Sequence, residues 1–375
     1  MSRRSPLLAG LGPLLAALAV ACAPAAPPAG PADAARPASA RASDSPAPAA
    51  PSATAARQAP LKVRVAYTPT VPSAGLFLGI SHGYFAEEGI EPDLVPFDSG
   101  EQALPVLATG QVDASTLGLS AGLFAAVARG AELKIVAGNS SNEPGYSSSA
   151  FVVRKDLVDS GALRELADLR GRTLAVNSQT GGLAIDVSRG LQSAGLSDAD
   201  VTWQLLPFPD MLPALANGVI DVGAETEPFV ARAVAAGIGV RWKGMDEVYP
   251  YHQLTVIAYA PSFMRDEPDG ATRFLTAYLR GARDFADAFK HGRNRADVIA
   301  VLGEYTSIKE PSLYEQMVPS GIDPDGNMNL DGLEYDQAWY LERGYLREKI
   351  DLSRLVDFRY RDAALERLGR YMPRP

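Results

Sequence analysis

The spacing of apolar residues divides the chain, from residue 61 onward, into strands and helices that follow each other in turn. The stretch Leu61–Tyr67, LKVRVAY, alternates apolar and polar residues as a half-buried strand does. Residues 74–88 then carry apolar side chains at helical spacing up to a glycine. This alternation of strands and helices predicts an α/β protein with mostly parallel sheets. Further strands are expected at 92–97, 112–115, 133–137, 149–153, 173–177, 201–206, 219–223, 239–242 and 253–259.

One segment of the chain occurs twice. Val95–Gly118 and Leu206–Pro228 each have the pattern of a strand end, a loop, a short helix, a glycine turn and a short strand. Two copies of one α/β unit indicate two similar lobes that face each other, with a ligand held by the loops after the strands. The alternative is a common helix-ending phrase that recurs by chance. The shared residues are Leu104, Pro105, Leu107, Ala108, Gly110 and Asp113 in the first copy and Leu212, Pro213, Leu215, Ala216, Gly218 and Asp221 in the second.

The second α/β set interrupts the first. We expect residues 61–149 to begin lobe one, residues 150–254 to form lobe two, and residues 255–375 to supply a return strand and C-terminal helices to lobe one. Two strands that cross between the lobes would form a hinge. The helical C-terminal region should pack on lobe one, whose sheet would otherwise lack cover.

The first 60 residues have the composition of an export signal and a tether. Basic residues precede a short apolar run, which is typical of a secretory signal peptide over residues 1–21. Cys22 follows at the place where a bacterial lipoprotein is acylated, which predicts a lipid anchor on the outer face of the cytoplasmic membrane. The alternative is plain cleavage with an incidental cysteine. Residues 22–60 are rich in Ala and Pro and are expected to form a disordered tether.

Composition excludes several classes of protein. The chain has 375 residues, a net charge of −9 and no basic cluster after its first residues, which argues against nucleic-acid binding. It has one cysteine and three well-separated histidines, so neither a disulfide framework nor a cysteine- or histidine-rich metal site is expected. We expect no cofactor.

Four motifs resemble those of ABC-transporter substrate-binding proteins of the nitrate, sulfonate, taurine and thiamine-pyrimidine-precursor group, and they occur in the same order along the chain. They are Gly83–Ile90 (GYFAEEGI), Ala108–Ala114 (ATGQVDA), Asp168–Val176 (DLRGRTLAV) and Glu227–Phe229 (EPF). The resemblance implies a type II periplasmic-binding fold, with two α/β lobes that close on a small molecule. It also implies ABC permease subunits as partners; we expect the protein to be a monomer.

The candidate ligand residues follow the expected strands, where open α/β sheets bind ligands, and match the segments that line the cleft in the resembled family. In several of them an ordinary structural role is an equal alternative, such as a helix cap at Ser178–Gly181 or a strand end at Tyr67. The candidates in lobe one are Tyr67, Thr68, Thr70, Ser99, Gly100, Thr116, Leu117, Asn139 and Ser140. Those in lobe two are Ser178, Gln179, Thr180, Gly181, Glu225, Thr226 and Glu227.

Two ligand classes remain open at this point. Tyr67 could stack on a planar ring, and Glu225 and Glu227 could pair with an amine, which favours a pyrimidine-like thiamine precursor. The second class is a small anion such as a sulfonate, taurine or nitrate, held by backbone N–H groups.

A different class of function is an enzyme on the same fold, similar to a pyrimidine synthase or a desulfinase. The single cysteine lies outside the expected domain, so a thiol nucleophile is absent from it. His252 is the only histidine near the predicted cleft, and no acid partner is evident in the sequence. We therefore expect a binding protein without catalytic residues.

Overall fold

The structure of the protein is a computed structural model that describes residues 59–373. The predicted signal peptide (1–21), Cys22 and nearly all of the predicted tether lie outside the described residues. Among the described residues, no helix has both the length and the apolar content needed to cross a membrane.

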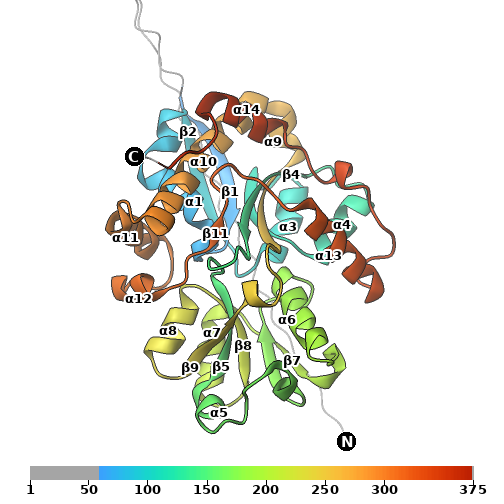
Figure 1. The fold of residues 1–375 in the computed structure, drawn as a ribbon. Helices are drawn as coiled ribbons and strands as arrows, with labels where there is room; N and C mark the ends of the chain where they lie inside the picture. Colours follow the sequence, from blue (N-terminus) through green and yellow to red (C-terminus); the bar gives the residue numbers. More distant parts are fainter. Residues whose placement is uncertain (1–58, 374–375) are drawn as a thin grey trace, which may run out of the picture. The chain divides into compact units, whose positions relative to one another are not determined.

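Lobe one is built on a six-stranded sheet with the strand order β11-β4-β10-β3-β1-β2 (Figure 1). Strand β1 pairs in parallel with β2 and β3, whereas β10 runs antiparallel between β3 and β4. The strands are β1 (Leu61–Tyr67), β2 (Ile90–Pro96), β3 (Ala114–Gly118), β4 (Lys134–Ser141), β10 (Gln253–Tyr259) and β11 (Gly321–Ile322).

Lobe two is built on a five-stranded sheet with the order β7-β6-β8-β5-β9. Strand β6 pairs in parallel with β7 and β8, and β5 runs antiparallel between β8 and β9. The positions of β6, β7 and β8 therefore repeat those of β1, β2 and β3, which confirms the two similar α/β lobes. The strands are β5 (Ser149–Arg154), β6 (Thr173–Val176), β7 (Thr202–Leu205), β8 (Val222–Thr226) and β9 (Gly239–Gly244).

The two aspartates of the sequence repeat, Asp113 and Asp221, make equivalent hydrogen bonds in the two sheets. Asp113 accepts a hydrogen bond from the backbone N–H of Arg64 through Oδ2 at 2.8 Å and donates its own N–H to the Arg64 carbonyl at 2.8 Å. Asp221 makes the same pair of bonds with Thr173, at 3.0 and 2.9 Å. Asp113 therefore ties β3 to β1, and Asp221 ties β8 to β6, so both aspartates have a structural role.

Helices cover both faces of the two sheets. In lobe one, α1 and α10 lie on one side of the sheet and α3 and α4 on the other (Figure 1). The helices of the first half are α1 (Ala74–Ser81), α2 (Tyr84–Glu87), α3 (Gly100–Ala108), α4 (Ala121–Ala128), α5 (Lys155–Asp159), α6 (Gly182–Ser193), α7 (Phe208–Ala216) and α8 (Phe229–Ala235). Those of the C-terminal region are α9 (Pro261–Asp266), α10 (Pro268–His291), α11 (Arg295–Tyr305), α12 (Pro311–Gln316), α13 (Leu330–Glu342) and α14 (Arg359–Leu368). Short 3₁₀ turns lie at Val71–Ser73, Leu166–Leu169, Asp198–Asp200, Met245–Glu247 and Leu352–Arg354.

The C-terminal region packs on lobe one as predicted, but α13 also reaches lobe two. The chain on either side of α13 is fixed to β4, because Gly138 N–H bonds the Gly326 carbonyl and Ile135 N–H bonds the Leu355 carbonyl. Between these two anchors α13 contacts both α4 of lobe one and α6 of lobe two. The sequence pattern could not predict this contact of α13 with lobe two, because it locates helices and strands but does not show which of them touch.

A buried polar network joins the second lobe-to-lobe connection to α6 and α13. His252 lies just before β10, and its ring nitrogens are 2.7 Å from Asp186 of α6 and 3.1 Å from Asp336 of α13. All three side chains are fully buried. Burial opposes charge on His252, but the two carboxylates outweigh it and raise its pKa to about 10. His252 therefore carries a positive charge shared by two acids that come from different elements.

Several strands extend further than the sequence pattern predicts. Strands β3, β4 and β8 end at Gly118, Ser141 and Thr226, whereas the pattern ends them at 115, 137 and 223. The extra residues are mostly small or polar, but ladder bonds to β10 and β5 hold them in strands. Conversely, the helix predicted over 74–88 is divided into α1 and α2, because Gly83 has a left-handed φ of 76°.

Candidate ligand-binding site

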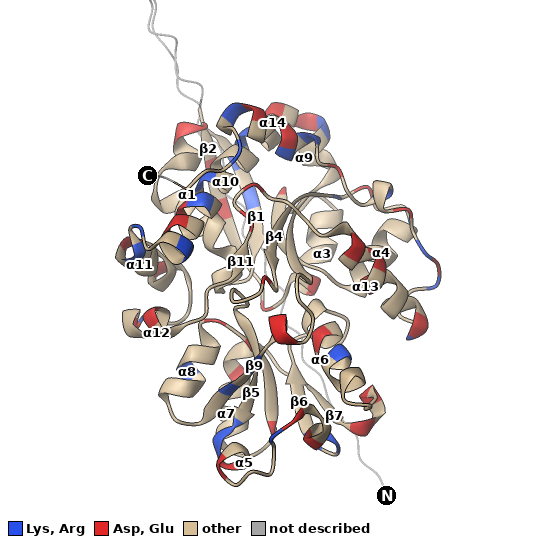
Figure 2. Ribbon diagram, viewed as in Figure 1, with Lys and Arg blue, Asp and Glu red and all other residues tan. Residues whose placement is uncertain are grey.

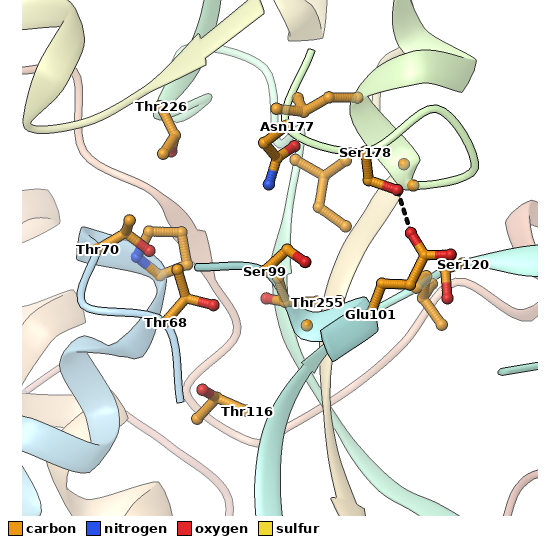
Figure 3. Close-up of a pocket in the computed structure, with 18 of the residues that line it drawn as sticks. Thr68, Thr70, Ser99, Glu101, Thr116, Ser120, Asn177, Ser178, Thr226 and Thr255 are labelled. Atoms are coloured by element: carbon orange, nitrogen blue, oxygen red, sulfur yellow. Dashed lines mark hydrogen bonds between the residues drawn. The ribbon is translucent and has the colours of Figure 1, made fainter. Parts of the chain in front are cut away.

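A cavity lies between the two lobes, where the carboxyl ends of parallel strands of both sheets meet (Figure 3). Its volume of about 90 Å³ has room for about seven water-sized positions. It is lined by Thr68, Thr70, Pro72, Ser73, Ser99, Gly100, Glu101, Thr116, Gly118, Leu119, Ser120, Asn139, Ser149, Asn177, Ser178, Gly181, Gly182, Leu183, Phe208, Thr226, Leu254 and Thr255.

Many of the residues chosen from the sequence are brought together at this cavity. They share small or polar side chains and lie in or just after six strands of the two lobes. The predicted residues that line the cavity are Thr68, Thr70, Ser99, Gly100, Thr116, Asn139, Ser178, Gly181 and Thr226.

The other predicted residues lie off the cavity, and strand alternation explains three of them. Leu117, Ser140 and Glu225 each neighbour a lining residue, so within a strand they point to the opposite face. Leu117 is buried in the core, and Ser140 instead bonds the Ser320 hydroxyl at 2.6 Å. These three residues are therefore not among the cavity-lining residues, and their contact with a ligand stays a prediction.

Tyr67, Gln179 and Thr180 are also displaced from the cavity. The ring of Tyr67 packs edge-on against Phe77 at 5.5 Å and is not among the cavity-lining residues. Gln179 is exposed on the loop before α6, and the Thr180 hydroxyl donates to Glu101 at 2.9 Å.

Glu227 and Glu225 are both buried, but only Glu227 has hydrogen-bond partners among the described residues, since neither carboxylate oxygen of Glu225 has one. Glu227 accepts hydrogen bonds from the backbone N–H groups of Ala231 and Val318, at 2.9 and 3.1 Å. Burial raises its pKa to about 7. Burial, followed by the neighbouring Glu227, raises the pKa of Glu225 well above its usual value. Neither acid is among the cavity-lining residues, so the structure gives no support to an amine held by them there.

Two further groups of residues line the cavity and were not predicted from the sequence. The first is polar and comprises Ser73, Glu101, Ser120, Ser149, Asn177 and Thr255, of which Asn177 directly follows β6 and carried a usable signal. The second is an apolar wall, composed of Pro72, Leu119, Leu183, Phe208 and Leu254. These side chains come from segments far apart in the chain, so no local pattern distinguishes them from core residues.

Two helices begin at the cavity with unused hydrogen-bond donors. The residues before α3 and α6, Ser99 and Gly181, line the cavity, and neither makes a side-chain capping bond. The first-turn N–H groups of a helix have no partner inside the helix, and the helix dipole makes this end positive. Both helix ends can therefore bind a negatively charged group.

Asn139 presents a fixed donor to the same space. Its carbonyl oxygen accepts a hydrogen bond from the Tyr278 hydroxyl at 2.6 Å, and burial raises the pKa of Tyr278, which keeps that hydroxyl protonated. The amide Nδ2 is therefore the end left over, and within the described residues it has no hydrogen-bond partner. The same holds for the hydroxyls of Ser120 and Thr226. A ligand that accepts hydrogen bonds would satisfy these buried groups.

The cavity lacks a basic side chain and contains one acidic one. No Lys or Arg is among the lining residues of the described chain. Elsewhere on the protein, basic and acidic residues lie close together, for instance along α14 (Figure 2). Glu101 of lobe one is the single charged residue of the lining, and it accepts hydrogen bonds from Ser178 and Thr180 of lobe two (Figure 3). Any negative ligand must therefore be held by neutral donors.

The approach of α3 to β3 allows no side chain at Gly100. A Cβ atom there would lie 2.1 Å from the backbone nitrogen of Gly118, whereas a Cβ on Gly118 would meet Gly100 at 3.6 Å, an ordinary contact. We expect Gly100→Ala to lower the free energy of unfolding by about 1–3 kcal/mol, since backbone must shift to admit the methyl group. Chemical denaturation measures this effect, with Gly118→Ala as the matched control. Equal stabilities of the two variants would contradict the close approach.

Comparison with known proteins identifies the family. The model of the NMT1-like family matches residues 56–303. The chain belongs to the NMT1-like family. Among solved structures, this NMT1-like chain is similar to the alkanesulfonate-binding protein SsuA from Xanthomonas axonopodis pv. citri bound to MOPS. The TM-score is 0.62 at 21% identity, over 79% of this chain and 96% of that one. This likeness concerns the fold, and it confirms the expected two-lobed periplasmic-binding architecture.

Two curated relatives share part of the sequence. A riboflavin-binding protein, RibY, of Chloroflexus aurantiacus is 26% identical over 59% of this chain and 60% of its own length. A putative aliphatic sulfonates-binding protein of Escherichia coli is 28% identical over 49% of this chain and 54% of its own length. The matched region thus spans between half and two thirds of each relative.

Proposed function

We propose that this NMT1-like protein is the extracytoplasmic substrate-binding component of an ABC importer, and that it captures a small organic oxyanion such as an alkanesulfonate between its lobes. The observation that carries the proposal is the set of unpartnered donors at one cavity between the lobes. Asn139 Nδ2 and the hydroxyls of Ser120 and Thr226 lack partners, and two helices begin there. Oxyanions accept hydrogen bonds on several sides at once and are favoured at helix N-termini.

The apolar wall supports an organic ligand over nitrate or another small inorganic ion. Leu183, Phe208 and Leu254 offer contact area that such an ion cannot use, whereas the alkyl chain of a sulfonate can. The cavity volume of about 90 Å³ limits the ligand to a few heavy atoms beyond the head group, which favours a ligand much smaller than riboflavin.

The planar, amine-bearing ligand predicted from the sequence has lost its support. Tyr67, Glu225 and Glu227 carried that hypothesis, and none of the three is among the cavity-lining residues. A pyrimidine precursor therefore becomes the alternative that the binding experiment must distinguish from an oxyanion.

The residues that line the cavity favour a transport protein over an enzyme. The lining residues of the described chain include no Cys or His, so the cavity offers no ready nucleophile or histidine base for a desulfinase-like reaction. Permease subunits as partners, the lipid anchor on Cys22, export and a monomeric state belong to the same proposal.

Calorimetric titration tests the proposal. We expect alkanesulfonates of two to five carbons to bind in the micromolar range or tighter, with one molecule bound per chain and affinity rising with chain length until the cavity is full. An aminopyrimidine serves as the competing ligand. Binding of the aminopyrimidine, without binding of any sulfonate, would overturn the oxyanion assignment and leave the importer role standing. Turnover of a bound sulfonate or sulfinate would instead establish an enzyme.

A further inference from the structure

Glu101 places a carboxylate beside a cavity that otherwise presents donors. It lies in the first turn of α3, directly after the unused helix end at Ser99 and Gly100. In Figure 3 it borders the cavity on the side away from Thr68 and Thr70. A carboxylate next to an anion site repels the anion and so opposes its binding. The presence of Glu101 at this place therefore calls for an explanation.

Hydroxyl groups of the opposite lobe hold this carboxylate in place. The Ser178 hydroxyl donates to Oε2, and the Thr180 hydroxyl donates to Oε1 at 2.9 Å. A further hydrogen bond joins the two lobes beside them, from Ala121 N–H to the Thr180 carbonyl at 3.1 Å. Glu101 of lobe one is therefore held by hydrogen bonds from lobe two in this arrangement of the lobes.

No positive side chain cancels the charge. Across residues 59–373, none of the ion pairs involves Glu101, and the cavity lining contains no Lys or Arg. The two helix ends supply about half a positive charge each, which together balance about one negative charge of a ligand. A second negative charge on the ligand would face the Glu101 carboxylate without compensation.

We propose that Glu101 is a specificity-determining residue that rejects dianions, so that the cavity selects oxyanions carrying a single negative charge. This inference rests on the proposed oxyanion site and deepens it. Singly charged sulfonates fit, whereas doubly charged phosphonates, phosphate esters and inorganic sulfate are rejected although their shapes are similar. Glu101 also joins the two lobes, because it accepts hydrogen bonds from the hydroxyls of Ser178 and Thr180. We call these two hydrogen bonds the clasp.

The experiment compares two ligands of the same shape and different charge. Butanesulfonate carries one negative charge, and butylphosphonate at about pH 9 carries two, as phosphate groups do above their second pKa. Affinities are measured by calorimetry for the wild-type protein, for Glu101→Gln and for Thr180→Val. The threonine variant removes one bond of the clasp, changes no charge and alters no lining residue, so it reports the effect of a weaker clasp alone.

We expect the wild-type protein to bind butanesulfonate at least tenfold more tightly than butylphosphonate. Glu101→Gln should reduce this ratio on the order of tenfold, as expected for removing one charge several ångströms from the ligand. Thr180→Val should weaken both ligands by the same factor and leave the ratio unchanged. An unchanged ratio in a folded Glu101→Gln protein that still binds butanesulfonate would overturn the inference alone. Binding of neither ligand by the wild-type protein would overturn the oxyanion site and this inference with it.

Discussion

Replacing His252 with alanine is expected to lower the free energy of unfolding by about 3–5 kcal/mol, the usual cost of removing one partner from a buried ion pair. The substitution leaves Asp186 and Asp336 facing each other, both fully buried, without the cation that they share. It also removes the ring that stacks on Tyr249 at 4.3 Å. The effect should reach both lobes, since Asp186 belongs to α6 and Asp336 to α13.

The pH dependence of stability identifies the charge on His252. Its pKa in the folded protein is about 10, above the value of a free histidine. The stability that it contributes is therefore fully present below the unfolded pKa of about 6.5 and is lost as the pH rises through about 10. Glu227, whose pKa is about 7, has completed its titration by about pH 8. We therefore expect wild-type stability to fall between about pH 8 and pH 10 more steeply than that of His252→Ala.

Urea denaturation followed by tryptophan fluorescence measures both effects. His291→Ala is the matched control, because His291 is exposed at the end of α10. A loss of stability below about 1 kcal/mol for His252→Ala, or the same pH slope in both proteins, would contradict a charged histidine between the two acids.

Asn139→Asp is expected to weaken oxyanion binding by about 2–5 kcal/mol, which corresponds to a factor of about 30 to several thousand in Kd. The substitution is nearly isosteric and keeps an oxygen for the Tyr278 hydroxyl. It replaces the unpartnered Nδ2 donor with a second oxygen, so a carboxylate would face the ligand. The protein should remain folded, because the oxygen that faces Tyr278 is retained.

Gln179→Glu is the matched control for added charge. Gln179 is exposed and lies next to the lining residue Ser178, so the variant adds the same charge close to the cavity and outside it. We expect a change in affinity of less than about threefold, since solvent screens an exposed charge. Tighter binding of the natural ligand by Asn139→Asp would show that the ligand presents a donor at this place, as an aminopyrimidine would.

The sequence predicted those features of the fold that depend on local pattern. Strand alternation and the repeat located two α/β lobes, and the paired roles of Asp113 and Asp221 followed from their equivalent positions. The ends of β3, β4 and β8 were predicted too early, because Thr116, Asn139 and Thr226 are polar residues that the sheet holds by ladder bonds. The polar content of a strand end can equally mark a loop, and tertiary pairing decides between the two.

The candidate site was predictable where one strand end sufficed and unpredictable where two distant segments had to meet. Thr68, Thr70 and Ser178 could be chosen from strand ends, and the structure places all three on the cavity. Glu101 gains its role from hydroxyls of the other lobe, and Leu254 gains its role from the return of the chain to lobe one. The choice between Thr226 and its neighbours Glu225 and Glu227 required the side-chain direction, which depends on where β8 ends.

A crystal structure of the protein with an alkanesulfonate shows directly whether this cavity binds an oxyanion. We expect the sulfonate oxygens within hydrogen-bond distance of Asn139 Nδ2 and of first-turn N–H groups at α3 or α6, with the alkyl chain against Leu183, Phe208 and Leu254. A sulfonate bound outside this cavity, or bound in it with its head group away from Asn139 and both helix ends, would contradict the proposed oxyanion site.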